Sequence, residues 1–142
     1  MAKIVFDNGI KTYDIEDEKG NLRGQISFNP ADINMFKRYE AVEKAVEDAY
    51  TVFAEADRAN ADYLKLFEET DTNVKNKINE FFDDMNASNV IFGSQHVFNM
   101  HNGKTLLERF MTMIMPVIKA DFKEEYVKSQ ERIEKYTEQV SE

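Results

Sequence analysis

The sequence predicts an α+β fold that is predominantly helical, and three stretches of the chain support this prediction. Residues 4–28 alternate apolar and polar positions around glycine-containing turns, which is typical of antiparallel strands. Residues 31–69 hold neither glycine nor proline and repeat apolar side chains every three or four positions. Residues 104–118 are apolar on nearly every side, which indicates a buried helix. We expect a single domain over residues 1–142, with a β-meander over 1–28, a helical core over 30–118 and a C-terminal helical arm over 119–142.

Length and composition limit the classes of protein to which the chain can belong. Its 142 residues suit one domain, and a hydrophobic fraction of 42% is too high for intrinsic disorder. A net charge of −9, spread along the chain, repels phosphate backbones and disfavours ordinary nucleic-acid binding. The lack of cysteine excludes disulfides and thiolate chemistry. The sequence shows no signal peptide and no apolar run of membrane length, so we expect a soluble cytoplasmic protein that is not secreted and does not bind membranes.

The N-terminal stretch predicts a meander of three antiparallel strands over residues 4–6, 10–15 and 22–28. Asn8-Gly9 is a strong hairpin signal because both residues tolerate positive φ, and a second turn follows over residues 17–21. In the last strand Leu22, Ile26 and Phe28 share one face. Such a small sheet is marginal alone, so we expect it to pack on a helix.

A long helix is predicted to begin at Asn29-Pro30, where asparagine caps the free amides and proline suits the first helical position. If it continues to about Glu69, its roughly 38 residues span about 57 Å. The alternative is a break near residues 57–62 that gives two shorter helices. Spacings of three and four residues define a heptad seam, which requires a second helix from this chain or from another copy. The seam consists of Tyr39, Val42, Val46, Ala49, Phe53, Ala56, Asn60, Tyr63 and Phe67.

Three further helical segments follow. A cap at residues 70–72 precedes an apolar stripe over 74–85, and residues 89–99 predict a short helix and turn on the core. The last helix should begin near Lys104 and be kinked or split at Pro116, since proline removes an amide donor. Beyond Pro116 the apolar residues become sparse between charges, which indicates an arm that lies against another surface and is not part of the core.

No catalytic or metal-binding constellation is recognisable, so we expect neither an enzyme nor a cofactor. His96 and His101 are the only histidines, too few ligands for zinc, and Ser94 lacks the glycine-elbow context of a nucleophile. Adjacent carboxylates fall on charged helical faces, where solvated surface is the simpler interpretation. The methionine-rich stretch 111–115 favours core packing; its alternative is an adaptable surface for a partner's apolar helix.

The protein is therefore predicted to act by binding another protein, with self-association through the same surfaces as an option. The candidate binding residues lie on the heptad seam, in the methionine-rich stretch and on the arm. They are Tyr39, Val42, Val46, Phe53, Tyr63, Met111, Met115, Phe122, Tyr126, Ile133 and Tyr136.

The chain resembles the tail assembly chaperones encoded among the tail genes of siphophages and prophages of Gram-positive bacteria. The resemblance rests on ISFNPADIN at residues 26–34, followed by a long acidic helix, on LERF at 107–110 and MPVI at 115–118, and on RIEKYT at 132–137. It implies a non-catalytic partner that keeps the helical, aggregation-prone tape measure protein soluble in the bacterial cytoplasm while the tail tube polymerises. It brings no defined binding residues.

Other classes of protein fit the sequence as well. One is a structural minor tail or connector protein of the virion, and another is an acidic inhibitor that mimics nucleic acid. An enzyme comes last, because no substrate suggests itself.

Overall fold

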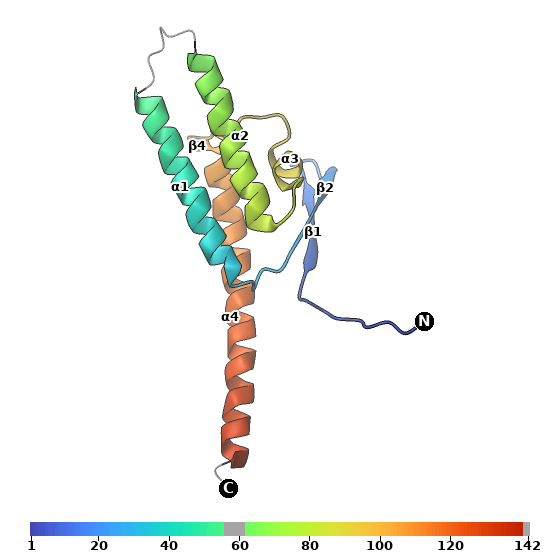
Figure 1. The fold of residues 1–142 in the computed structure, drawn as a ribbon. Helices are drawn as coiled ribbons and strands as arrows, with labels where there is room; N and C mark the ends of the chain where they lie inside the picture. The colour runs from blue at the N-terminus through green and yellow to red at the C-terminus, as the bar shows by residue number, and fades with distance from the viewer. Residues whose placement is uncertain (56–61, 141–142) are drawn as a thin grey trace.

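The computed structural model describes residues 1–55 and 62–140, with side chains described as far as residue 132. The fold is α+β and predominantly helical, as predicted, with an N-terminal β-hairpin followed by long helices (Figure 1). The elements in chain order are β1 (Lys11–Glu16), β2 (Leu22–Phe28), α1 (Asn34–Glu55), α2 (Tyr63–Phe82), α3 (Ala87–Phe92), β3 (Met100–His101), β4 (Lys104–Thr105) and α4 (Leu106–Val140).

The N-terminal sheet has two strands in the described chain, so the prediction of a three-stranded meander is wrong in its strand count. β1 and β2 pair antiparallel, with Tyr13 opposite Ile26, and the turn between them is the predicted one at residues 17–21. Residues 1–10 form no strand, and Phe6 is 82% exposed. The reason lies at Asn8, whose side chain accepts a hydrogen bond from the Ile10 amide at 3.3 Å. This local turn replaces the hairpin ladder that Asn8-Gly9 predicts.

The exposed end of the hairpin also differs from the sequence prediction. Ile26 and Phe28 are buried, whereas Leu22, which was assigned to the same face, is 60% exposed. A register shift at Ile15/Glu16 accounts for this, because Glu16 pairs with Leu22 one step out of the preceding register. Only the part of β2 near Phe28 therefore contributes to the core.

Helix α1 begins at Asn34, four residues later than predicted. The Asn29 side chain accepts from the Ala31 amide at 2.9 Å, which forms a turn around the buried Pro30. The Asp32 carboxylate then accepts from the Asn34 amide at 2.9 Å. Two short side-chain turns thus precede the helix, and Asn29 caps the first of them instead of α1.

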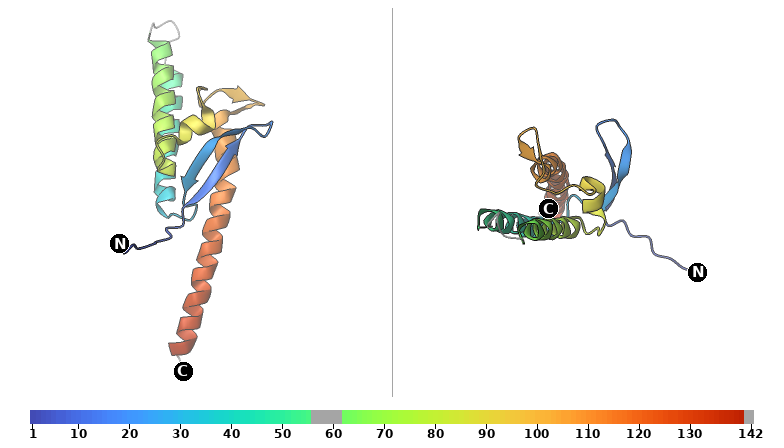
Figure 2. Two further views of the ribbon diagram at one scale, coloured as in Figure 1. Left: turned by 90° about the vertical axis from the view of Figure 1, so that its right-hand side faces the viewer. Right: turned by 90° about the horizontal axis from the view of Figure 1, so that it is seen from above.

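The prediction of one continuous helix to Glu69 is wrong, and the alternative of two shorter helices is confirmed. α1 ends at Glu55, α2 begins at Tyr63, and the two lie side by side in opposite directions (Figures 1 and 2). Phe53 stacks on Phe67 with ring centroids 4.6 Å apart, so the seam folds back on itself. The seam positions Ala56 and Asn60, and most of the expected break, lie outside the described residues.

Helix α2 runs through residues 70–72, where the sequence predicted a new helix start. Asp71 does not cap a helix. It accepts a hydrogen bond from the Val97 amide at 2.9 Å and pairs with Lys75 at 2.9 Å. α2 ends at Phe82, and its C-cap Asp83 has a left-handed φ of 52° and an amide that donates back to the last turn.

The core lies where the helical hairpin, β2, α3 and α4 meet. At its centre Phe82 packs edge-on against Phe28 at 4.9 Å and against Phe110 at 5.9 Å. β2 approaches α3 so closely that a Cβ on Gly24 would lie 3.0 Å from Val90. A larger residue at Gly24 would therefore push the hairpin away from the core.

Helix α4 is continuous from Leu106 to Val140, so Pro116 does not split it. Leu107, Phe110, Ile114 and Ile118 follow helical spacing and are all buried. Met113 is 61% exposed, which corrects the expectation that this segment is buried on nearly every side. The second half of α4 extends away from the other elements (Figures 1 and 2).

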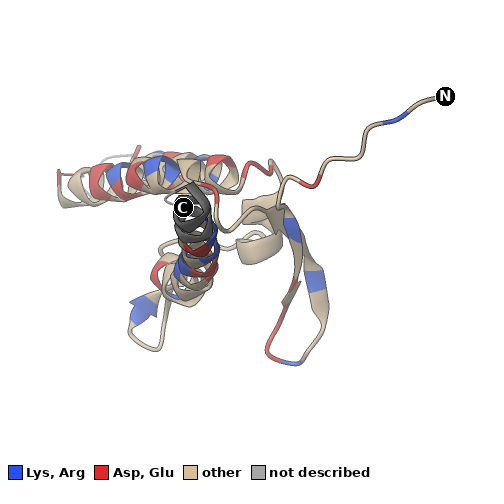
Figure 3. Cartoon of the chain, turned by 90° about the horizontal axis from the view of Figure 1, so that it is seen from below, with Lys and Arg blue, Asp and Glu red and all other residues tan. Residues whose placement is uncertain are grey.

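Acidic and basic residues alternate over the helices, as Figure 3 shows from below. Few of the charges form ion pairs between elements. The shortest such pair joins β1 to α4, with the Lys11 ammonium 2.6 Å from the Asp121 carboxylate. This hydrogen bond to Asp121 raises the pKa of Lys11 above its usual value.

Candidate binding groove between α1 and α4

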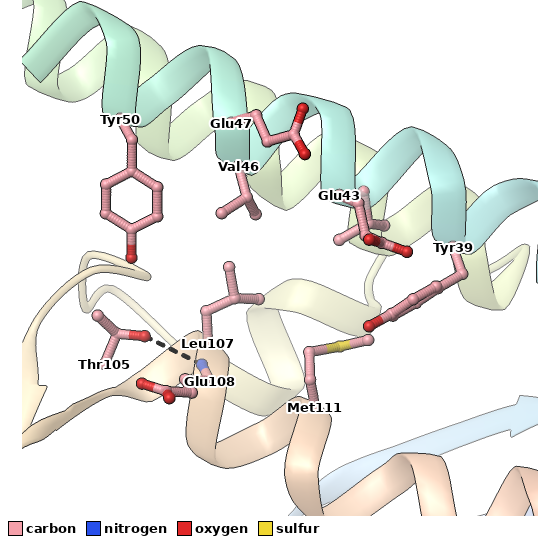
Figure 4. Close-up of a pocket in the computed structure, with 10 residues that line it drawn as sticks. Tyr39, Glu43, Val46, Glu47, Tyr50, Thr105, Leu107, Glu108 and Met111 are labelled. Atoms are coloured by element: carbon pink, nitrogen blue, oxygen red, sulfur yellow. Dashed lines mark hydrogen bonds between the residues drawn. The ribbon is translucent and has the colours of Figure 1, made fainter.

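A groove of about 350 Å³ lies between the middle of α1 and the first turns of α4 (Figure 4). The side chains of both helices point into it from opposite walls. Its lining consists of Tyr39, Val42, Glu43, Val46, Glu47 and Tyr50 on α1 and of Thr105, Leu107, Glu108 and Met111 on the facing wall. The volume lies in the range of small-ligand pockets, and the elongated wall of α1 is suited to a rod-shaped ligand.

Helical spacing places the lining residues on one face of α1. Tyr39, Val46 and Tyr50 recur at intervals of seven and four residues, so their side chains lie above one another along the helix. On the opposite wall α4 begins directly after β4, and the Thr105 hydroxyl accepts a hydrogen bond from the Glu108 amide at 3.0 Å. This N-cap fixes the first turn of α4 and thereby the position of Glu108.

Two aromatic contacts of α1 flank the groove. Near the start of α1, Phe36 packs edge-on against Phe122 of α4 at 5.2 Å. Further along, Tyr50 contacts Phe98, in the segment before β3, at 5.4 Å. Along α1 the groove lies between these two contacts, from Tyr39 to Tyr50.

The floor of the groove is apolar and forms part of the core. Val42 and Leu107 are 2% and 4% exposed, and Val46 and Met111 are half-buried against the same cluster. A ligand in the groove would therefore lie on side chains that are already fixed by packing. Met111 is the most adaptable of them, because its thioether chain has several low-energy conformations.

Three carboxylates stand around this apolar floor. Glu43 and Glu47 lie one turn apart on α1, and Glu108 faces them from α4. In the described part of the chain none of the three carboxylates takes part in an ion pair or a side-chain hydrogen bond, and no lysine or arginine lines the groove. The groove thus combines an apolar floor with an uncompensated negative rim.

Four of the eleven predicted binding residues line this groove, namely Tyr39, Val42, Val46 and Met111. Phe53 and Tyr63 lie elsewhere, and both contact Phe67: Phe53 reaches it from α1, whereas Tyr63 lies one turn before it in α2. The structure does not bring these two together with the other four. The stacked rings of Phe53 and Phe67 join the two helices of the hairpin.

The remaining predicted residues are distributed along α4. Met115 is half-buried against the core, and Phe122 packs on Phe36 at the point where α4 leaves the body. Tyr126 is 57% exposed on the projecting part. The side chains of Ile133 and Tyr136 lie outside the described part of the chain.

The sequence analysis missed the acidic rim of the groove. Glu43, Glu47 and Glu108 were not among the predicted binding residues, and neither were Tyr50, Thr105 and Leu107. One signal was available, because none of the three glutamates has a lysine or arginine four residues further on. Their convergence, however, depends on how α1 and α4 pack, which local sequence does not determine.

Neither histidine belongs to the groove. The Nδ1 atom of His96 accepts the Phe98 amide at 3.1 Å, so Nε2 carries the proton and donates to the Phe67 carbonyl at 2.9 Å. His96 therefore attaches the loop before β3 to α2. His101 is exposed in the short hairpin of β3 and β4. Among residues 1–55 and 62–132, no group of three or more histidine or acidic side chains is arranged to hold a metal ion.

Comparisons of the chain with protein-family models, with curated proteins and with solved structures find no match. Over the described residues, no helix combines the length and the apolar character that crossing a membrane requires.

Proposed function

We propose that the protein is a non-catalytic tail assembly chaperone of a phage or prophage. In this role it binds the tape measure protein, or another helical tail protein, in the cytoplasm of the bacterial host and keeps it soluble during tail assembly. The proposal starts from the resemblance of residues 26–34, 107–110, 115–118 and 132–137 to such chaperones. It implies that the chain works by holding another protein and performs no chemistry.

The observation that carries the proposal is the groove between α1 and α4. A hydrophobic floor that includes Val46, Leu107 and Met111 is open to a ligand along one face of a long helix. Helical partners commonly bind in such grooves by their apolar faces. A chaperone that shields a helical, aggregation-prone protein needs a surface of this kind.

Exposed apolar residues on α4 add a second surface. Met113 and Tyr126 are 61% and 57% exposed, and Val117 and Val127 are 38% and 44% exposed. Met113 and Val117 lie one turn apart on one face of α4, and exposed apolar side chains that lie together are a common mark of a protein-binding site. This supports an interaction that extends beyond the groove.

The distribution of charge favours protein binding over mimicry of nucleic acid. A mimic needs rows of carboxylates that reproduce the spacing of phosphates, whereas basic residues interrupt the acidic ones along the helices (Figure 3). On α4, for example, Lys128 pairs with Glu124 at 3.2 Å. We therefore place the inhibitor hypothesis behind the chaperone.

Co-expression with the tape measure protein encoded in the same tail gene cluster tests the proposal. We expect the tape measure protein to shift from the insoluble to the soluble fraction and to co-purify with this chain. The variant Val46→Arg, which places a long charged side chain in the groove, should reduce that yield. The matched control is Leu22→Arg, which adds the same charge at an apolar side chain of β2 that is 60% exposed and lies outside the groove.

Two results would contradict the proposal. One is a tape measure protein that stays insoluble and does not co-purify in the presence of the wild-type chain. The other is detection of this chain in purified virions by mass spectrometry, which favours a structural tail or connector protein.

A further inference from the structure

One class of ligand matches the chemistry of both the apolar floor and the acidic rim of the groove. We propose that the groove binds a basic amphipathic helix of a partner protein, with apolar side chains on the floor and lysine or arginine side chains beside Glu43, Glu47 and Glu108. Identifying this helix as part of a tail protein rests on the proposed function, but its chemistry is argued from the groove itself.

The negative rim determines the charge of the occupant. Glu43 and Glu47 are four residues apart on one face of α1, a spacing at which two like charges repel each other in the empty groove. Glu108 adds a third carboxylate from the opposite wall, and no lysine or arginine lines the groove beside them. A partner with lysine or arginine at matching positions relieves this repulsion and gains charge complementarity.

The shape of the groove favours a helix over a strand. Binding of a strand needs an open sheet edge, and the only strand residue in the lining is Thr105 at the end of two-residue β4. The α1 wall extends from Tyr39 to Tyr50, a rise of about 17 Å at 1.5 Å per residue. This corresponds to about three turns of a bound helix, with apolar anchors at positions i, i+4 and i+7.

Within residues 1–55 and 62–132, the chain itself does not provide a suitable occupant. The exposed apolar residues Ile4, Val5 and Phe6 precede β1, which Lys11 fixes beside Asp121 of α4, and they extend away from the groove (Figure 1). A second copy would bring the helical surface of the arm, where Glu124, Glu125 and Glu131 outweigh Lys128 and Arg132 over residues 124–132. A negative helix against a negative rim is unfavourable.

Binding of synthetic peptides to the full-length protein tests the proposal. The probe is a fluorescent 14-residue helical peptide with leucines at i, i+4, i+7 and i+11 and lysines on both flanks. One control peptide has glutamates in place of the lysines, and another has the same composition without an apolar face. Fluorescence anisotropy should show saturable binding of the basic amphipathic peptide alone, weakened when salt is raised from 50 to 500 mM.

Matched protein variants locate the binding site. The triple change Glu43→Gln, Glu47→Gln and Glu108→Gln should weaken the basic peptide about ten-fold, since each exposed charge pair contributes modestly. The control triple Glu18→Gln, Glu68→Gln and Glu131→Gln removes the same charge at exposed positions elsewhere and should stay within about two-fold.

Loss of binding in the groove triple will not reflect unfolding. Removing the repulsion between Glu43 and Glu47 should leave the melting temperature unchanged or slightly higher, which circular dichroism checks. The proposal is overturned if no peptide binds, if the acidic peptide binds as well as the basic one, or if both triples behave alike. It is also overturned if light scattering shows that a second copy fills the groove.

The peptide experiment and the co-expression experiment test different claims, so either one can fail while the other succeeds. If the peptides bind as expected but the tape measure protein stays insoluble, the proposed function is contradicted. The proposal that the groove binds a basic amphipathic helix would then still stand. Rescue of the tape measure protein by the wild-type chain and by the groove triple alike would support the function and contradict this groove as its site.

Discussion

The two halves of α4 share one continuous helix and have opposite surroundings. In the first half Phe110, Ile114 and Ile118 are at most 7% exposed and complete the core. In the second half Tyr126 is 57% exposed, and the helix extends into solvent (Figure 2). The first half of α4 therefore contributes to stability, whereas the second half extends the helix beyond the other elements. Substitutions in the first half, or in the elements packed on it, should lower the free energy of unfolding. Substitutions in the second half, the arm, should instead change which surfaces the protein can contact.

Removing a large side chain from the core should give the largest effect. Phe82→Ala deletes a ring that is 1% exposed and contacts both Phe28 and Phe110, so we expect a loss of about 3–5 kcal/mol in the free energy of unfolding. Urea unfolding followed by circular dichroism measures it. Tyr126→Ala on the arm is the matched control and should stay within about 0.5 kcal/mol. Similar losses for both variants would break the distinction between body and arm.

The two histidines extend the comparison to polar residues. His96→Ala removes both the acceptor for the Phe98 amide and the donor to the Phe67 carbonyl, and we expect a loss of about 1–3 kcal/mol. Exposed His101→Ala should change the free energy of unfolding by less than about 0.5 kcal/mol. An unchanged midpoint of urea unfolding for the His96 variant would show that its loop is not held in this way.

Shortening the arm tests whether the body folds without it. A chain ending at residue 126 retains Phe122 and its contact with Phe36, the last aromatic contact of α4 with the body. We expect its body to unfold cooperatively, with less than about 1 kcal/mol lost, because isolated helical ends contribute little. Amide hydrogen exchange should show unchanged protection in α2 and β2. Loss of cooperative unfolding would mean that the arm is part of the core.

The ion pair at the base of the arm should give the smallest effect, and it depends on pH. The hydrogen bond to Asp121 raises the pKa of Lys11 above its usual value of 10.5. The stabilisation from this ion pair is therefore complete below pH 10.5 and is lost as the pH rises through the higher pKa of the folded state. NMR titration of the Lys11 side chain should give a pKa nearer the ordinary lysine value in Asp121→Asn than in the wild type. Equal values in the two proteins would exclude the interaction with Asp121.

Patterns within single helices and strands predicted the fold class correctly. The departures of the structure from the predictions arose from contacts between elements. The heptad seam was correct in its periodicity, and its partner is the second half of the same seam, joined by Phe53 and Phe67. The turn at Asp17 was also correct, because its carboxylate accepts the Lys19 and Asn21 amides at 2.8 and 2.9 Å and so fixes the turn locally. Residues 4–6 have the composition of a strand and lack a neighbouring strand to pair with.

The groove could be predicted only in part. The apolar wall from Tyr39 to Val46 follows from the seam, and Met111 follows from the methionine-rich stretch. The acidic rim does not, because Glu43 and Glu108 are 65 residues apart in sequence and meet only through the packing of α1 on α4. On an isolated helix these glutamates would be ordinary surface charges. They form an acidic rim because α1 and α4 both place carboxylates around the same groove.

The continuity of α4 through Pro116 has a consequence for affinity. Met111 in the groove and Tyr126 on the arm are 15 residues apart on one helix, a fixed rise of about 22 Å. A ligand attached at one point is therefore held near the other at a high effective concentration, and two weak contacts act together as avidity. Because a stiff helix defines the span, only a ligand long enough to reach both points gains from it. In the proposed role, the same helix that carries the core would also set the minimum length of a ligand that gains from both contacts.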